Sequence, residues 1–338
     1  MEQLKKLLVI ANLTHASPRI PNLLTPLAKK GWDIKVVTPW MSEAEEESLG
    51  LPEDFKKNVK VFYTPNYKDV YQPVRNFLHF IGAVPEGTET GFTNALKEVK
   101  VVERFQHKLI DQLLRVYQSL FAFPDTEKAW RPIAQPIIEK ILNDSPHTII
   151  VSSSPYPTSH IIAKQVCIKY GAKWIADFRD PWSSNHNYKL PKWRKQIDQF
   201  LEKRTLKPAH VIITVNDNIV KKMKLIHKQD IRVIANGYQP STKHLKVTSR
   251  NKKFEILYTG AIYPDHQHVE PILEALKLIK DKKTAEIECF RLRFCGKFSS
   301  ELQQKIAGLG LIPNVEQMGY LSRAETRRLQ SSATLLLV

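Results

Sequence analysis

Residues 173–182 read KWIADFRDPW, and this stretch decides how the chain folds. Its first half is an apolar run typical of a strand buried in a sheet, and Pro181 prevents regular strand pairing beyond it. Asp177, Arg179 and Asp180 therefore lie at a strand end, the place where open parallel sheets bind their ligands. The pattern leaves two interpretations open: a ligand-facing charge cluster or a structural Arg–Asp ion pair.

Strands and helices alternate on both sides of this stretch. Short apolar runs predict strands, and apolar side chains at helical spacing predict the helices between them. Such β-α-β alternation predicts a parallel sheet. The expected strands are 7–11, 34–38, 59–63, 148–152, 211–215 and 232–235, and the expected helices are 19–30, 130–142, 158–170, 190–206 and 218–224.

A basic stretch poor in large apolar residues, 241–253, predicts a linker, and a second β-α-β series follows it. Its expected strands are 254–258, 290–294, 315–318 and 334–338, its expected helices include 269–279 and 300–307, and Ser322 with Glu325 has the spacing of a capping box. We therefore expect an α/β protein with two Rossmann-like domains, 1–240 and 254–338. A helical insertion is expected in the first domain at about 64–128.

Within that insertion, 94–121 carries a broad apolar stripe interleaved with lysines and arginines. The pattern fits a helix that packs on the core and turns a basic face to solvent. This is the favoured interpretation, and the alternative is an element that lies on a membrane surface, where apolar burial combines with attraction to anionic lipid.

The composition limits the partners. The 338-residue chain has a formal net charge of +17, which favours nucleic acid, acidic lipid headgroups or a phosphorylated small molecule. Nucleic acid is the least favoured, because the sequence has no zinc-finger spacing, aromatic RNA-binding signature or recognition-helix motif. Cys167, Cys289 and Cys295 show no CxxC spacing, which is typical of a reducing compartment. With no apolar run of membrane-spanning length, we expect a cytoplasmic protein that can rest on the inner face of the plasma membrane.

Seven short motifs occur in an order that resembles GT-B glycosyltransferases, especially the bacterial family-four enzymes that build surface polysaccharides. The motifs are SSPYP at 153–157, ADFRDPW at 176–182, VIITV at 211–215, IANGY at 234–238, LYTGAIY at 257–263, LRFCG at 292–296 and GYLS at 319–322. The resemblance implies two domains facing a cleft, with a nucleotide diphosphate sugar on the second and a glycan or lipid-linked acceptor on the first. It also implies retaining hexosyl transfer, with no obligatory metal and no cofactor beyond the donor substrate.

The resemblance assigns roles to residues at the strand ends. Asp177, Arg179 and Asp180 are the expected catalytic residues, with Asp180 orienting hydroxyls and Arg179 bracing it or meeting phosphate. The expected acceptor-binding residues are Arg19, Ser153, Ser154, Tyr156 and His160. The expected donor-binding residues are Gly260, Tyr263, His266, Gly296, Lys297 and Tyr320. Family members often clamp the diphosphate with an arginine and a lysine near Gly260, where this chain offers histidines instead.

Two features of the family are missing from this chain. They are the pair of glutamates eight residues apart that should follow 334–338, and the helix that returns to the first domain. We therefore expect a truncated second domain, and the activity of the 338-residue form stays open. Three alternatives remain: a sugar-nucleotide epimerase of the same fold, a non-catalytic partner or scaffold of an intact transferase, and a nucleic-acid-binding protein.

Overall fold

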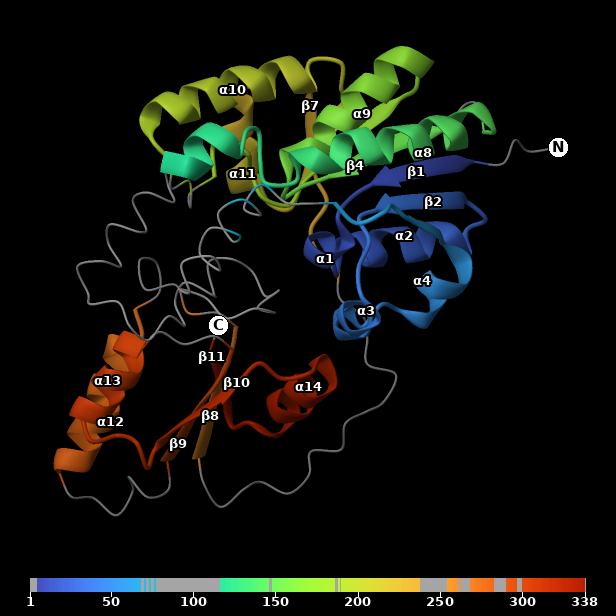
Figure 1. Cartoon of the computed structure of the whole chain (residues 1–338). Helices are drawn as coiled ribbons and strands as arrows, with labels where there is room; N and C mark the ends of the chain where they lie inside the picture. The colour runs from blue at the N-terminus through green and yellow to red at the C-terminus, as the bar shows by residue number, and fades with distance from the viewer. Residues whose placement is uncertain are drawn as a thin grey trace. The chain divides into compact units, whose positions relative to one another are not determined.

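A computed structural model of the chain divides into two compact units, 1–238 and 239–338 (Figure 1). The structure describes residues 5–67, 70, 73, 76, 116–145, 148–185, 188, 190–237, 254–260, 262, 268–282, 290–296 and 300–337. The expected linker 241–253 lies outside these residues. Each unit is therefore considered by itself.

The first unit is built on a seven-stranded sheet in the order β3-β2-β1-β4-β5-β6-β7, and every neighbouring pair is parallel. The expected parallel sheet is thus confirmed. The strand expected at 232–235 is shifted, because the β6 pairing begins with Val211 opposite Asp230. The strands are β1 (Lys6–Ile10), β2 (Asp33–Thr38), β3 (Lys60–Tyr63), β4 (Ile149–Ser153), β5 (Trp174–Phe178), β6 (Val211–Thr214) and β7 (Asp230–Val233).

Helices cover both faces of this sheet (Figure 1). One layer holds α1 (Leu13–Ala16), α2 (Arg19–Lys29), α3 (Glu43–Leu49) and α4 (Glu53–Asn58), and the other holds η1 (Lys128–Trp130), α8 (Arg131–Asn143), α9 (Pro157–Tyr170), α10 (Lys192–Leu206) and α11 (Asp217–Lys224). Side chains alternate between the two cores along β1: Leu8 and Ile10 face the α8–α9 layer, whereas Leu7 and Val9 face the α2–α4 layer. This alternation is the expected consequence of strand geometry.

Three short helices, α1, α3 and α4, were not expected from apolar periodicity. Polar groups define the first two, because Asn12 caps α1, and Ser42 with Glu45 forms a capping box that starts α3. A capping box satisfies backbone N–H groups that a helix start leaves without partners, so it can define a helix with no buried residue.

Most of the expected insertion at 64–128 lies outside the described residues. Its last part, 116–121, is helical. The buried Arg194 of α10 anchors the end of this helix by donating to the carbonyl oxygens of Ser119 (2.7 Å), Ala122 (3.0 Å) and Pro124 (3.0 Å). The segment is therefore tied to α10 through its backbone.

The second unit has a smaller parallel sheet in the order β10-β9-β8-β11. The predicted capping box is confirmed, because Ser322 accepts from the Glu325 backbone while the Glu325 carboxylate accepts from Ser322. In Figure 1, α12 and α13 lie on one side of the sheet and α14 on the other. The elements are β8 (Phe254–Thr259), α12 (Glu270–Asp281), β9 (Phe290–Cys295), α13 (Ser300–Gly308), β10 (Val315–Gly319), α14 (Arg323–Ser332) and β11 (Leu335–Leu337).

None of the helices in the described part of the chain has the length and apolar character that crossing a membrane requires. Cys167 and Cys295 are buried and unpaired, so they are core residues, and Cys289 lies outside the described residues.

Candidate functional site

Polar side chains gather where the strand order of the first sheet reverses. The chain runs outward from β1 to β2 and β3, then crosses back to β4 on the other side of β1. Open α/β sheets bind ligands beyond the strand ends at such a switch point. Asn12 follows β1, Ser153 and Ser154 end or follow β4, and Asp177 lies on β5, so these residues share one edge of the sheet.

A buried ion pair forms the floor of this edge. The Arg19 Nη2 atom lies 2.7 Å from Asp177 Oδ1, and Arg19 Nε lies 3.0 Å and 3.1 Å from the two carboxylate oxygens. The Ser153 hydroxyl donates to Asp177 Oδ2 at 2.7 Å. Arg19 Nη1 reaches the Ile234 carbonyl oxygen at 2.7 Å and Asn236 Oδ1 at 3.0 Å. This network joins α2, β4, β5 and the segment after β7.

The burial of this pair bears on two expectations. Arg19 was expected to bind an acceptor phosphate and Asp177 to act in catalysis, yet their side chains are 2% and 0% exposed. All three guanidinium nitrogens of Arg19 and both carboxylate oxygens of Asp177 bond to protein groups. The structural interpretation of the strand-end charge therefore holds for Asp177, and Arg19 and Ser153 position it.

Arg19 stands at an unfavourable place for a cation, the first position of α2. Helix N-termini carry partial positive charge and favour anions. The α2 N-cap is Pro18, which makes no side-chain capping bond, and the first turn contains no acidic residue. The negative charge of the Asp177 carboxylate compensates the positive charge of the Arg19 guanidinium and the partial positive charge of the helix end. Arg19 therefore has a structural reason to occupy this position.

Above the floor lies a partly exposed rim. Arg179 Nε lies 3.0 Å from Asp180 Oδ2, and the two side chains are 29% and 41% exposed. The predicted bracing of Asp180 by Arg179 is thus present in the geometry. Arg179 Nη1 also donates to the His15 carbonyl oxygen at 2.6 Å, and the Ser154 hydroxyl donates to the Asp180 carbonyl oxygen at 3.2 Å. Ser154 is itself buried, so it positions the rim rather than facing solvent.

His15 belongs to the rim and was not predicted. Its Nε2 atom lies 3.2 Å from the Tyr156 hydroxyl, and the two rings meet edge to face. Desolvation by the surrounding chain, and then the Arg179 cation, lower the pKa of His15, while Glu45 opposes them. The imidazole is therefore neutral at pH 7. The sequence signal that could have identified His15 as a site residue is the group of polar residues directly after β1.

His160 was expected to bind acceptor, and the structure places its side chain in the core. The side chain is fully buried, with Nδ1 2.7 Å from the Ser152 hydroxyl and the ring stacked on Phe178. Trp174 Nε1 donates to the same hydroxyl at 2.8 Å. Burial lowers the pKa of His160 to about 3, so the ring is a neutral core group that supports β4 and β5.

A carboxyl group at this edge titrates near neutral pH. Glu127 precedes η1, and its side chain hydrogen-bonds to Asn12 after β1 and accepts from the Tyr67 hydroxyl after β3. Burial raises the pKa of Glu127 to about 7, against the opposing effect of the Asn12 hydrogen bond. Sequence reasoning missed Glu127, because nothing in the run 124–128 distinguishes it from Asp125.

This carboxyl predicts a pH-dependent stability. Because the pKa of Glu127 is raised from 4.5 to about 7, the folded protein holds a proton in that window that the unfolded chain releases. The contribution of Glu127 to the free energy of unfolding should fall as the pH rises from 5 to 8, by about 3 kcal/mol at most, and neutral His160 contributes in the opposite direction. Urea unfolding of wild type and Glu127→Gln at both pH values measures the effect. The variant should lose this part of the slope, whereas Glu139→Gln on α8, whose carboxylate accepts from Lys169 of α9, should keep it. An unchanged slope in Glu127→Gln would contradict the assignment.

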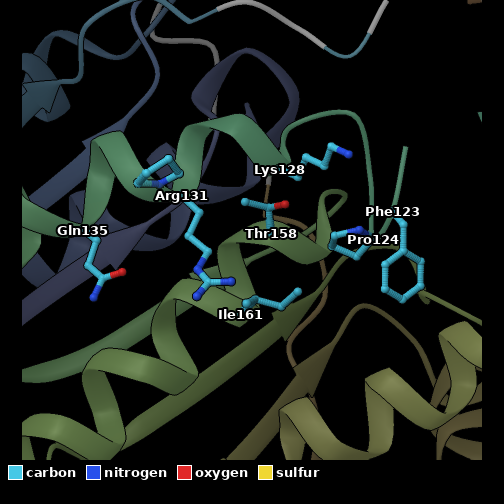
Figure 2. Close-up of a pocket in the computed structure, with 8 residues that line it drawn as sticks. Phe123, Pro124, Lys128, Arg131, Gln135, Thr158 and Ile161 are labelled. Carbon is cyan, nitrogen blue, oxygen red and sulfur yellow. The ribbon is translucent and has the colours of Figure 1, made fainter. Parts of the chain in front are cut away.

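A pocket of about 410 Å³ lies between the N-terminal halves of α8 and α9 (Figure 2). Arg131 and Gln135 extend from α8 toward α9, and Ile161 with Pro124 supplies apolar wall. The N-terminus of α9 is already capped: Asp125 accepts from the Thr158 backbone at 2.6 Å and from its hydroxyl at 2.7 Å. This helix end is therefore not open to a phosphate.

In the second unit, two of the expected donor residues lie on one edge of the sheet. Gly260 follows β8 and Gly296 follows β9, with φ angles of 152° and 146°, a region that favours glycine. Gly260 N donates to the Cys295 carbonyl oxygen at 2.9 Å, and Gly296 N donates to the Gly319 carbonyl oxygen at 2.7 Å. The two glycines add no side chain of their own at this edge, and the Tyr258 hydroxyl lies close to Gly260.

The structure describes only some of the other residues that were expected to bind the donor. Tyr320 follows this edge and is 79% exposed. Tyr263, His266 and Lys297 lie outside the described residues, and their expected roles stay predictions. Across the described part of the chain, no group of three His, Cys, Asp or Glu side chains comes together as a metal site would require.

No protein-family model and no curated protein matches the sequence. Solved structures do resemble the fold. HepE of Anabaena in complex with UDP has a TM-score of 0.54 at 12% identity, covering 98% of this chain and 73% of that one. Sucrose-phosphate synthase of Thermosynechococcus elongatus has a TM-score of 0.55 at 11% identity over 98% and 74%. A variant of S. aureus TarM in complex with fondaparinux, alpha-GlcNAc-glycerol and UDP has a TM-score of 0.56 at 10% identity over 98% and 80%.

These neighbours confirm the predicted fold class. The chain has two Rossmann-like, parallel-sheet α/β domains of the GT-B type, and the second is the smaller.

Proposed function

We propose that the chain is a glycosyltransferase that moves a hexose from a nucleotide diphosphate sugar to a glycan or lipid-linked acceptor, with retention of configuration, in cell-surface polysaccharide synthesis. The GT-B fold supports the class of reaction. HepE, whose fold is similar, has been solved with UDP and with UDP-glucose, which supports a nucleotide sugar as the donor. The family-four resemblance of the motif order supports the acceptor class.

One observation carries the proposal: the rim of Arg179, Asp180, His15 and Tyr156 at the switch point of the first sheet. It is the partly exposed continuation of a buried network, so its groups are held in place before a ligand arrives. Preorganised charges of this kind can stabilise a transition state without reorganising during the reaction. The Asp180 carboxylate can accept a hydrogen bond from a sugar hydroxyl, and the Arg179 guanidinium can donate hydrogen bonds to a phosphate oxygen.

The proposed route of sugar transfer depends on which carboxylates a bound sugar could reach. Asp177 is buried and paired with Arg19, and the rim carboxylate Asp180 is paired with Arg179, so we assign neither as the nucleophile of a double displacement. The acceptor hydroxyl oxygen instead forms the new bond to the anomeric carbon from the face that the diphosphate leaves, and its proton passes to a departing phosphate oxygen. The protein then orients the reactants and stabilises the charge on the leaving group, as retention without a protein nucleophile requires.

The donor side is proposed to be the strand-end backbone of the second unit. Gly260 and Gly296 leave room for a diphosphate against main-chain groups, and Tyr320 is exposed beside them. The N–H groups of Gly260 and Gly296 already bond to strand carbonyl oxygens, so other backbone N–H groups and nearby cations would carry the diphosphate charge without a metal ion. We place this activity on the cytoplasmic side of the plasma membrane, where nucleotide sugars and lipid-linked acceptors meet.

Binding of sugar nucleotides tests the proposal. Thermal unfolding of the full chain should shift upward with one of UDP-glucose, UDP-N-acetylglucosamine or GDP-mannose, by the equivalent of about 2.7 kcal/mol at a hundredfold excess over Kd. Calorimetry on the same ligand should give a single site. If none of these donors or their free diphosphates binds, the non-catalytic scaffold is favoured, and conversion of a donor without acceptor would favour an epimerase.

A further inference from the structure

Helix α10 turns an apolar stripe toward solvent. Trp193, Ile197 and Phe200 are 46%, 43% and 65% exposed. Their spacing of four and three residues puts them on one face of the helix. Buried Arg194, Asp198 and Glu202 fix α10 to the rest of the unit. The exposed stripe is therefore the outer face of a firmly held helix.

A second exposed apolar group lies on the helix that Arg194 ties to α10. The helix 116–121 carries Val116, Leu120 and Phe121, which are 55%, 58% and 52% exposed. The Arg194 bonds to the Ser119 and Ala122 carbonyl oxygens hold this segment against α10, and Figure 1 shows the two side by side. The two groups together present six large apolar side chains to solvent.

The exposed charges on α10 all have one sign. Lys192, Lys195, Lys203 and Arg204 are exposed. Both acids of α10, all fifteen of whose residues are described, are buried: Asp198 bonds to Arg194 and Tyr188, and Glu202 bonds to Ser183 and His227. Exposed apolar side chains on a helix whose exposed charges are all cationic are the pattern of a helix that lies in the headgroup region of an anionic bilayer.

We infer that the outer face of α10, together with helix 116–121, is a docking surface for a membrane with anionic headgroups. Trp193 and Phe200 enter the headgroup boundary, while the lysine stems extend along the apolar surface and their ammonium groups meet lipid phosphates. A second copy of the chain is the less suitable occupant, because its α10 would bring the same cations into contact within a chain of net charge +17.

The docking surface is connected to the rim. Buried Glu202 of α10 accepts from the Ser183 backbone at 3.0 Å and also from its hydroxyl, which pins the loop that carries Arg179 and Asp180. His227 Nε2 lies 3.0 Å from the other Glu202 oxygen. A membrane-bound α10 thus holds this loop at the bilayer. The inference itself goes beyond the proposed function and does not depend on it.

Sedimentation with vesicles tests the surface on the full chain. Vesicles of phosphatidylcholine with 30% phosphatidylglycerol should bind the protein, and pure phosphatidylcholine should bind it weakly. The double variant Trp193→Ser/Phe200→Ser should lower the partition coefficient on the order of tenfold. The matched control Ile168→Ser/Leu225→Ser removes two side chains that are 62% and 86% exposed elsewhere on the unit, and it should bind like wild type.

A charge-matched pair of variants separates α10 from the overall charge. Replacing Lys192, Lys195 and Lys203 by Gln should weaken binding to anionic vesicles strongly. Replacing the three exposed α11 lysines, Lys221, Lys222 and Lys224, removes the same charge and should have a small effect. Equal losses in both triples, or equal losses in both apolar doubles, would overturn the inference. The inference would also be overturned if sedimentation velocity showed a dimer of the wild-type chain that becomes a monomer in Trp193→Ser/Phe200→Ser. Unfolding curves confirm that every variant is folded.

Discussion

Replacing Arg19 by alanine is expected to lower the free energy of unfolding by about 3–5 kcal/mol. The substitution leaves the Asp177 carboxylate buried without its cation, and it frees the Ile234 carbonyl and the Asn236 side chain on the far side of the site. The loss is much larger than the net contribution of the intact ion pair to the free energy of unfolding, because an unpaired buried charge keeps the full cost of its desolvation. Chemical denaturation at pH 7 measures it.

The matched control for this prediction is Arg232→Ala. Arg232 forms an ion pair with Asp230 in which the side chains are 70% and 49% exposed, and such pairs contribute about 0–1 kcal/mol. In the double variant Arg19→Ala/Asp177→Asn, removal of the stranded charge should recover part of the stability. Losses of similar size in Arg19→Ala and Arg232→Ala would show that the Arg19 pair has no special role.

Asp180→Asn and Arg179→Ala are each expected to lower kcat about a hundredfold or more in the transferase reaction, with little change in stability. The rim is partly exposed, so neither substitution leaves a buried charge alone. Arg179→Ala would remove the cation that meets the leaving-group phosphate, and Asp180→Asn would remove the carboxylate that orients a sugar hydroxyl; losses of this size are typical for preorganised groups. Steady-state kinetics with the sugar nucleotide identified by the binding screen measures the effect.

Two variants of the exposed pair serve as controls for these kinetics. Asp230→Asn and Arg232→Ala change the same residue types on β7, away from the rim, and should leave kcat unchanged. Near-normal turnover in both rim variants would remove the rim from the mechanism. A loss of turnover that follows a loss of folded protein would assign the rim a structural role only.

Much of the fold follows from the sequence because it depends on short-range geometry. The apolar run at the start of 173–182 forms β5, the β-α-β alternation gives two parallel sheets, and the Ser322–Glu325 spacing gives a capped helix. These patterns lie within a few residues of one another, where backbone periodicity and local hydrogen bonding decide the structure. Short helices without an apolar face, such as α3, carry no periodic signal and were missed.

The sequence by itself determined that charged groups stand at the end of β5, and only the tertiary structure decided what each of them does. Asp177 and Asp180 are three residues apart, yet one is fully buried and the other 41% exposed. The difference comes from Arg19, which is 158 residues away in the chain and meets Asp177 because β4, β5 and α2 share one edge of the sheet. Burial and partner choice depend on such long-range proximity, which local patterns do not encode, and they separate the buried floor of this site from its exposed rim.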